Sequence, residues 1–289
     1  MSPLLMSSPP TVPRTQAAGI QVRGAIATLP PGPPTLVVAS GRGGSGSSLL
    51  ATLLSAAAAG DGVRTLLIDA DDLVSPLAMT LGITPRASWM DLRGGRVAPP
   101  AVVTPVSTTL SLVAGGQERL GGGSGAPCPA PERKACMRRL QMLAESADLV
   151  VIDAGSRLDA VLAAITPHAG ERLLAVSSGS DPVGLASTYA LCKAVHERHP
   201  ALAVEVLVNR QDPREAARYH EAVDAGARQF LGWTLPLAGA IPDDPTLAAT
   251  LRAGLPFLEA AAGSPAANAA HAVVRQVLDP RSSSPSAGS

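Results

Sequence analysis

The sequence is poor in aromatic residues, in net charge and in cysteine. Aromatic side chains make up only 2% of the 289 residues while 46% are hydrophobic, so a core must be built mainly from Ala, Val, Leu and Ile. The 23 basic and 23 acidic residues cancel, which leaves no surplus of positive charge for general binding to a nucleic-acid backbone. The 3 cysteines contain no C-x-x-C pair, which fits a reducing compartment and excludes a disulfide framework.

Long apolar runs are also missing. No stretch approaches the roughly 20 uncharged apolar residues of a membrane span, and prolines interrupt the N-terminal segment MSPLLMSSPPTVPR, which lacks the apolar run of a signal peptide. The last predicted helix offers only Arg275 as a basic residue, so we expect no strong membrane anchor there. We therefore predict a soluble cytoplasmic protein whose association with the inner membrane, if any, is peripheral and goes through partners.

Composition divides the chain into three parts. Residues 1–33 are rich in Pro, Ser and Thr and are predicted to be a disordered arm, within which residues 15–29 have the pattern of a short helix. Residues 34–278 form the predicted domain. Residues 279–289 are rich in Ser and are predicted to be a disordered tail.

Within the domain, short apolar runs alternate with segments of helical pattern. Continuous apolar strands alternating with helices predict an α/β fold, with a mostly parallel sheet covered by helices on both faces. Ligands bind such sheets at the carboxyl ends of the strands. The predicted strands are 35–40, 63–71, 109–116, 148–155, 172–179, 204–210 and one near 237–244, and the predicted helices are 49–59, 75–83, 133–146, 181–199, 246–255 and 264–278.

A glycine-rich segment lies between the first predicted strand and the helix that follows. It has the frame G-x-x-x-x-G-[K]-[ST], in which glycines let backbone N–H groups wrap a phosphate and the helix adds its positive end. Ser48 stands where a hydroxyl holds Mg²⁺, but Ser47 occupies the position of the lysine that reaches the β- and γ-phosphates. We expect both nucleotide affinity and hydrolysis to be weakened. The segment is Gly41, Arg42, Gly43, Gly44, Ser45, Gly46, Ser47 and Ser48.

RGGSGSS (Arg42–Ser48) resembles the deviant phosphate loop K-G-G-x-G-K-[ST] of the MinD/ParA family of P-loop ATPases. In that family the first lysine reaches across a dimer to the phosphates of the partner. The resemblance therefore implies ATP and Mg²⁺ as cofactors, a homodimer, and Arg42 as the residue that reaches across. Arginine also pairs with phosphate, although its planar fork differs from an ammonium group.

Other family landmarks follow in the same order. LLIDADDLVSPLAMTLG resembles the segment that carries the acid orienting the attacking water, and DLVVIDAGSRLD resembles the Walker B strand with DTGAG after it. The resemblance implies that Asp71 positions water, that Asp69 and Asp153 belong with Ser48 to the metal site, and that Asn209 and Arg210 lie at the adenine. The structural alternative for the three acids is that they are helix caps or solvated ends of strands.

The flagellar branch of the family, the FlhG (FleN or YlxH) regulators, resembles this chain most over residues 35–278. DPVGLASTYALCKAV is similar to EPTSITDAYALIKVV of that branch. TQAAGIQ (Thr15–Gln21) is similar to its N-terminal activator helix D-Q-A-x-x-L-R, which implies that Gln16 stimulates an FlhF-like GTPase. A chance amphipathic segment explains residues 15–29 equally well.

Three functions fit these residues. The first is an FlhG-like regulator of the number or placement of flagella, with ATP hydrolysis weak or absent. The second is a pseudo-ATPase that serves as a scaffold in a pilus or secretion assembly. The third is a chromosome or plasmid partitioning ATPase, against which the zero net charge counts.

Overall fold

The structure is a computed structural model that describes residues 31–72, 76–93, 95–116, 128–178 and 182–279. The predicted helix 15–29, Gln16 and nearly all of the predicted tail lie outside these residues. The first strand, β1, begins at Pro31, and the domain boundary at residue 34 stays a prediction.

The described residues form an 8-stranded sheet with the order β3-β4-β2-β5-β1-β6-β7-β8. Every pairing is parallel except that of β3 with β4, which is antiparallel at the edge. The sequence pattern does not predict β3, which has only 3 residues, one of them a proline. The strands are β1 (Pro31–Ser40), β2 (Thr65–Asp69), β3 (Val103–Pro105), β4 (Leu110–Val113), β5 (Leu149–Gly155), β6 (Ala169–Ser178), β7 (Ala203–Asn209) and β8 (Leu237–Ile241).

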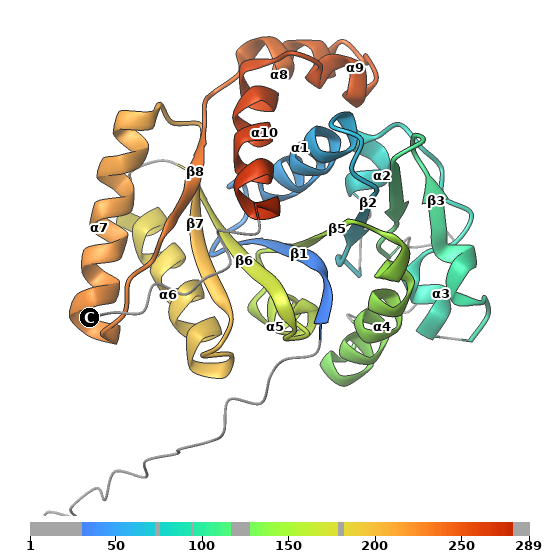
Figure 1. Ribbon diagram of the computed structural model, residues 1–289, viewed down its shortest axis with the longest axis horizontal. Coiled ribbons are helices and arrows are strands. Elements are labelled where there is room, and N and C mark those ends of the chain that lie inside the picture. The colour runs from blue at the N-terminus through green and yellow to red at the C-terminus, as the bar shows by residue number, and fades with distance from the viewer. Residues whose placement is uncertain (1–30, 73–75, 94, 117–127, 179–181, 280–289) are drawn as a thin grey trace, which may run out of the picture.

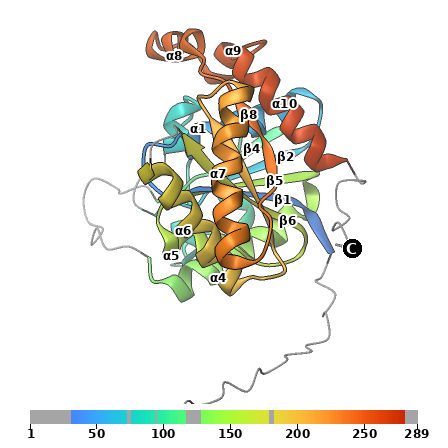
Figure 2. The same cartoon turned by 90° about the vertical axis from the view of Figure 1, so that its left-hand side faces the viewer.

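Helices cover both faces of this sheet, as Figures 1 and 2 show. The predicted class, a mostly parallel α/β fold with helices on both faces, is confirmed. The helices are α1 (Ser47–Gly60), α2 (Pro76–Thr80), α3 (Trp89–Arg93), α4 (Ala130–Leu143), α5 (Leu158–Ala164), α6 (Pro182–Arg198), α7 (Pro213–Leu231), α8 (Pro245–Arg252), α9 (Phe257–Ala261) and α10 (Pro265–Leu278).

Side chains that alternate along the strands divide the core into two layers. In β1, Val37 and Ala39 pack toward α3 to α7, whereas Leu36 and Val38 pack toward α1, α2 and α8 to α10. This alternation is the two-residue period of a strand with both faces buried. The scarcity of aromatics has the expected consequence, because both layers consist mainly of Val, Leu, Ile and Ala.

Four of these helices, α3, α5, α7 and α9, are absent from the sequence-based prediction. Three of them span one to two turns, but α7 has 19 residues and a clear start signal. Its N-cap Asp212 accepts hydrogen bonds from the backbone N–H groups of Arg214 (2.8 Å) and Glu215 (3.0 Å). Asp followed by Pro is a local helix-start pattern, so this helix was predictable.

Parallel pairing brings the ends of distant strands to one edge of the sheet. Asp69 at the end of β2 pairs in register with Asp153 of β5, and Ala39 of β1 pairs with Gly155. On the other side of β1, Ser178 of β6 pairs with Asn209 at the end of β7. Residues from five strands therefore meet beside the glycine-rich loop.

Candidate functional site

The glycine-rich loop folds on itself between β1 and α1. Gly44 and Gly46 have φ values of 82° and 88°, a left-handed conformation that favours glycine. The carbonyl of Arg42 accepts hydrogen bonds from the hydroxyls of Ser40 (2.9 Å) and Ser45 (3.1 Å). A Cβ at Gly41 would lie 2.1 Å from the backbone oxygen of Ser187, so the loop also packs closely against α6.

The N-terminus of α1 presents backbone N–H groups that no side chain caps. Its N-cap residue is Gly46, which has no side chain to accept a hydrogen bond, and the first turn contains no acidic residue. The first N–H groups of a helix lack partners within the helix and carry the positive end of its dipole. The loop and helix thus provide the donors that a phosphate group requires.

Asp153 at the end of β5 lies beside the first turn of α1. Its side chain hydrogen-bonds to Ser48, and its Oδ1 accepts from the backbone N–H of Gly155 at 3.1 Å. The pKa of Asp153 is raised to about 6, chiefly by burial; the hydrogen bonds with Ser48 and Gly155 lower it, and the nearby charge of Asp71 raises it. A hydroxyl paired with a desolvated carboxylate beside a phosphate-binding loop suits a hydrated Mg²⁺ ion.

Asp69 has a different position from Asp153. Its Oδ1 accepts from the backbone N–H of Asp71 at 3.1 Å, and its backbone carbonyl accepts from the indole of Trp89 at 2.8 Å. The carboxylate is fully buried and organises the turn after β2, which leaves Asp71 exposed. Its assignment to the metal site stays a prediction.

A cleft of about 230 Å³ joins several of the predicted residues. Its walls include Gly43, Gly44, Ser47, Ser48 and Asp71. Ser47 itself is buried, so the position of the missing lysine faces the cleft with a short neutral hydroxyl.

Three charged residues that were not predicted from the sequence also line the cleft: Asp72, Arg133 and Arg157. Arg133 of α4 and Arg157, which follows β5, both donate hydrogen bonds to the carboxylate of Asp72, the latter at 3.0 Å. Doubled acids in D-A-D-D and an arginine just after D-A-G-S were visible in the sequence. The pairing was not, because the partners are 61 and 85 residues apart.

Three other predicted residues, Arg42, Asn209 and Arg210, do not line this cleft. The guanidinium of Arg42 donates to the backbone oxygen of Ser178 at 3.3 Å. The amide of Asn209 donates to the backbone oxygen of Ser45 at 2.9 Å and so braces the loop from behind. Asn209 and Arg210 line a smaller hollow of about 90 Å³ between α1 and the ends of β7 and β8.

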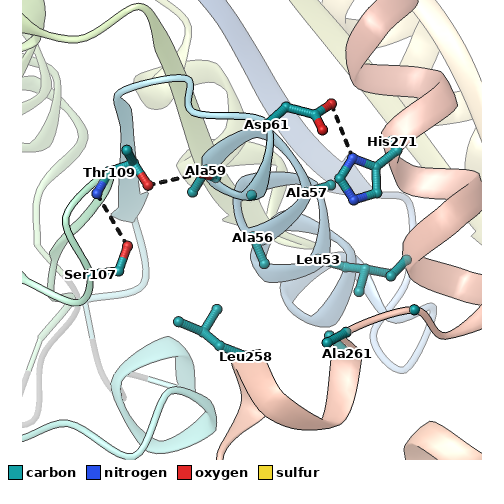
Figure 3. A pocket seen from close by; sticks show the side chains of 14 residues that line it. Leu53, Ala56, Ala57, Ala59, Asp61, Ser107, Thr109, Leu258, Ala261 and His271 are labelled. Atoms are coloured by element: carbon teal, nitrogen blue, oxygen red, sulfur yellow. Dashed lines mark hydrogen bonds and ion pairs between the residues drawn. The ribbon is translucent and has the colours of Figure 1, made fainter.

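A larger cavity of about 480 Å³ lies at the opposite end of α1 (Figure 3). Its walls come from α1, α9, α10 and the segment that leads into β4, and they include Leu53, Leu258 and Ala261. At its rim, Nδ1 of His271 and Oδ2 of Asp61 lie 3.2 Å apart in a hydrogen bond. No residue predicted for the functional site lines this cavity.

Within the described ranges, no helix is long and apolar enough to cross a membrane. The same residues contain no group of three or more His, Cys, Asp or Glu side chains that could hold a metal ion without help. A cation bound near Ser48 and Asp153 would therefore take part of its coordination from the ligand and from water.

Comparison with known proteins identifies the family. Residues 36–257 match the model of the CobQ/CobB/MinD/ParA nucleotide binding domain. The chain belongs to this family. The antiactivator FleN of Pseudomonas aeruginosa is 26% identical over 247 residues, which cover 84% of this chain and 85% of FleN.

Solved structures agree on the fold. The septum site-determining protein MinD of Pyrococcus horikoshii, complexed with Mg-ADP, superposes with a TM-score of 0.67 and 18% identity over 84% of this chain and 96% of that protein. Cobyrinic acid a,c-diamide synthase of Mycobacterium smegmatis, with a bound ATP analog and magnesium, gives a TM-score of 0.61 and 20% identity over 85% and 94% of the two chains. The predicted family and fold are thus confirmed.

Proposed function

We propose that this chain is an FlhG-like regulator that binds ATP and Mg²⁺ in the cleft beside the glycine-rich loop. One observation carries this proposal: the glycine-rich loop and the uncapped first turn of α1 line a single cleft, and Ser48 of that turn hydrogen-bonds to Asp153 at the end of β5. Donors for phosphate and oxygen ligands for a divalent cation then meet at the carboxyl edge of a parallel sheet, where such folds bind ligands.

Each residue has a definite part in this proposal. Backbone N–H groups from Gly43 to Ser48 would hold the phosphates, and the Ser48 hydroxyl and Asp153 would hold the cation. Asp71, exposed at the mouth of the cleft, orients the attacking water. Bound Mg²⁺ would supply positive charge to the phosphate oxygens.

ATP hydrolysis is the proposed activity that the missing lysine affects most. Ser47 carries no charge, whereas the lysine expected at its position stabilises the negative charge of the transferred phosphate. Loss of such an electrostatic contact costs on the order of 10² to 10³ in rate. We therefore propose that hydrolysis is slow or absent and that the protein acts mainly through its bound state.

The proposed assembly is a homodimer in which Arg42 reaches the phosphates of the partner. The contact of Arg42 with Ser178 places its side chain beside β6 rather than among the residues that line the cleft of its own chain. The similarity to FleN supports a role in setting the number or placement of flagella, with an FlhF-like GTPase meeting the segment near Gln16. A normal flagellar number in a strain that lacks this gene would contradict that role.

Titration of the protein with ATP and Mg²⁺ tests the nucleotide site. We expect measurable binding by the natural chain, and we expect Ser47→Lys to bind ATP at least about tenfold more tightly, because it restores a charged contact. Release of inorganic phosphate by the same variant tests whether Asp71 and Asp153 remain competent. Ser47→Ala is the matched control and should behave like the natural chain.

The outcomes of the binding and phosphate-release measurements distinguish the competing functions. Hydrolysis gained by Ser47→Lys supports a site that has lost only one charge. Tight binding without hydrolysis in both forms favours the scaffold. Failure of the natural chain to bind ATP in the presence of Mg²⁺ would overturn the proposed nucleotide function.

A further inference from the structure

Arg133 is a buried cation that its surroundings satisfy only in part. Its side chain is 0% exposed, and its Nη2 donates to Asp72 and, at 3.3 Å, to the backbone oxygen of Cys128. Its Nε and Nη1 have no hydrogen-bond partner among the described residues. A buried donor without a hydrogen-bond partner lowers the stability of the folded state. The guanidinium of Arg133, on the wall of the cleft, thus has two nitrogen atoms that can still donate to an acceptor.

Asp72 joins Arg133 to a second arginine. Its side chain is 1% exposed, and its Oδ2 accepts from Arg133 and from the backbone N–H of Cys128. Its Oδ1 accepts from Nη1 of Arg157 at 3.0 Å. Two guanidinium groups therefore share one carboxylate, and these three side chains carry a net positive charge on the wall that includes Ser47 and Ser48.

Arg157 is the accessible member of this cluster. Its side chain is 39% exposed, and it also pairs with Asp159 at 2.7 Å, whose side chain is 53% exposed. An ion pair between exposed side chains contributes little, so a phosphate can replace Asp159 as a partner at small cost. Asp72 is buried and anchored by Arg133, and it keeps the guanidinium at the cleft during that exchange.

We propose that Arg157 binds the terminal phosphate of the nucleoside triphosphate and supplies there the positive charge that Ser47 cannot supply. Asp72 is a positioning residue for Arg157, and Arg133 adds positive potential from behind. The terminal phosphate is the target because Arg157 shares the cleft with Asp71, the residue assigned to the attacking water. Arginine suits this task, since its planar fork matches two phosphate oxygens. This inference rests on the proposed function.

Calorimetric titration of Arg157→Ala with ATP and with ADP, each with Mg²⁺, tests the proposal. We expect the affinity for ATP to fall at least about tenfold, the loss of one charged hydrogen bond, and that for ADP to change less than about twofold. Arg157→Lys should recover part of the ATP affinity. The matched control Asp159→Asn, which removes only the exposed competitor, should retain ATP binding.

A rescue experiment distinguishes a charge from a structural role. Adding Ser47→Lys to Arg157→Ala should restore ATP affinity, because the lysine places a cation in the same cleft. Absence of rescue, or equal ATP affinity in Arg157→Ala and the natural chain, would overturn the role of Arg157 while leaving the nucleotide site intact. No ATP binding by the natural chain would overturn the proposed function and this inference together.

Discussion

The parallel strands end at the carboxyl edge of the sheet and begin at its amino edge. Each of these edges buries a carboxylate, but only at the carboxyl edge do other functional groups surround it. Burial raises the pKa of Asp153 at the carboxyl edge to about 6 and that of Glu171, near the start of β6, to about 7. Around Asp153 lie Ser48, the uncapped end of α1 and the cleft. Glu171 accepts one backbone hydrogen bond, from Thr166 at 3.1 Å, and its Oε2 has no partner within the described residues.

The cavities at the two edges differ in the same way. Helix α1 points its N-terminus at the smaller cleft of about 230 Å³ and its C-terminus at the larger cavity of about 480 Å³. A helix N-terminus attracts anions, and a C-terminus repels them. The end of α1 therefore disfavours a phosphate at the larger cavity and favours one at the smaller cleft, and the comparison teaches that converging backbone donors rather than volume or burial mark the candidate site.

The largest effect is expected at the carboxyl edge. Asp72→Ala should destabilise the protein by about 3–5 kcal/mol, because it leaves the guanidinium of Arg133 buried without its counter-ion. Urea unfolding monitored by circular dichroism measures this loss. The double variant Asp72→Leu with Arg133→Met should recover most of it, and the exposed control Asp159→Ala should change stability by less than about 1 kcal/mol. A loss below about 1 kcal/mol for Asp72→Ala would show that the buried pair is not held as described.

The second-largest effect is expected for Glu171, at the amino edge of the sheet. Because folding raises the pKa of Glu171, both states are protonated below about pH 4.5, and the penalty of a buried charge grows as the pH rises to about 7. Glu171→Gln should therefore stabilise the protein by roughly 2–3 kcal/mol at pH 8 and by almost nothing near pH 4.5. Unfolding curves across this range, with the exposed Glu145→Gln as control, measure the difference. The same gain at both pH values would refute a buried, ionisable Glu171.

The smallest effect belongs to the rim of the larger cavity. The hydrogen bond from His271 is the main cause that lowers the pKa of Asp61, with Arg275 contributing at 3.4 Å. The side chains of Asp61 and Arg275 are 34% and 73% exposed, so water screens these ion pairs. Asp61→Asn should leave the urea midpoint at pH 7 unchanged within error. A shift approaching that of Asp72→Ala would remove the contrast between the two edges.

Local signals explain how much of the fold was predictable. The alternation of apolar runs and helical patterns indicated the α/β class, and every predicted strand has a counterpart in the sheet. Short helices such as α3 and α5 escaped because one or two turns contain too few residues to show a period. The edge strand β3 was not predicted because its 3 residues join the sheet by pairing with β4, and the sequence pattern does not reveal this pairing.

The sequence by itself determined the family, the parallel α/β fold, the glycine-rich loop and the absence of its lysine, because each depends on residue types at short, fixed spacing. Only the tertiary structure decided that Arg133 and Arg157 meet Asp72 on the wall of the cleft beside the glycine-rich loop, and that Asn209 braces the loop through Ser45. These contacts join residues 61, 85 and 164 positions apart. Such pairings are determined by the order of strands in the sheet and by burial, which removes competing water. Neither can be inferred from the spacing of residues along the sequence.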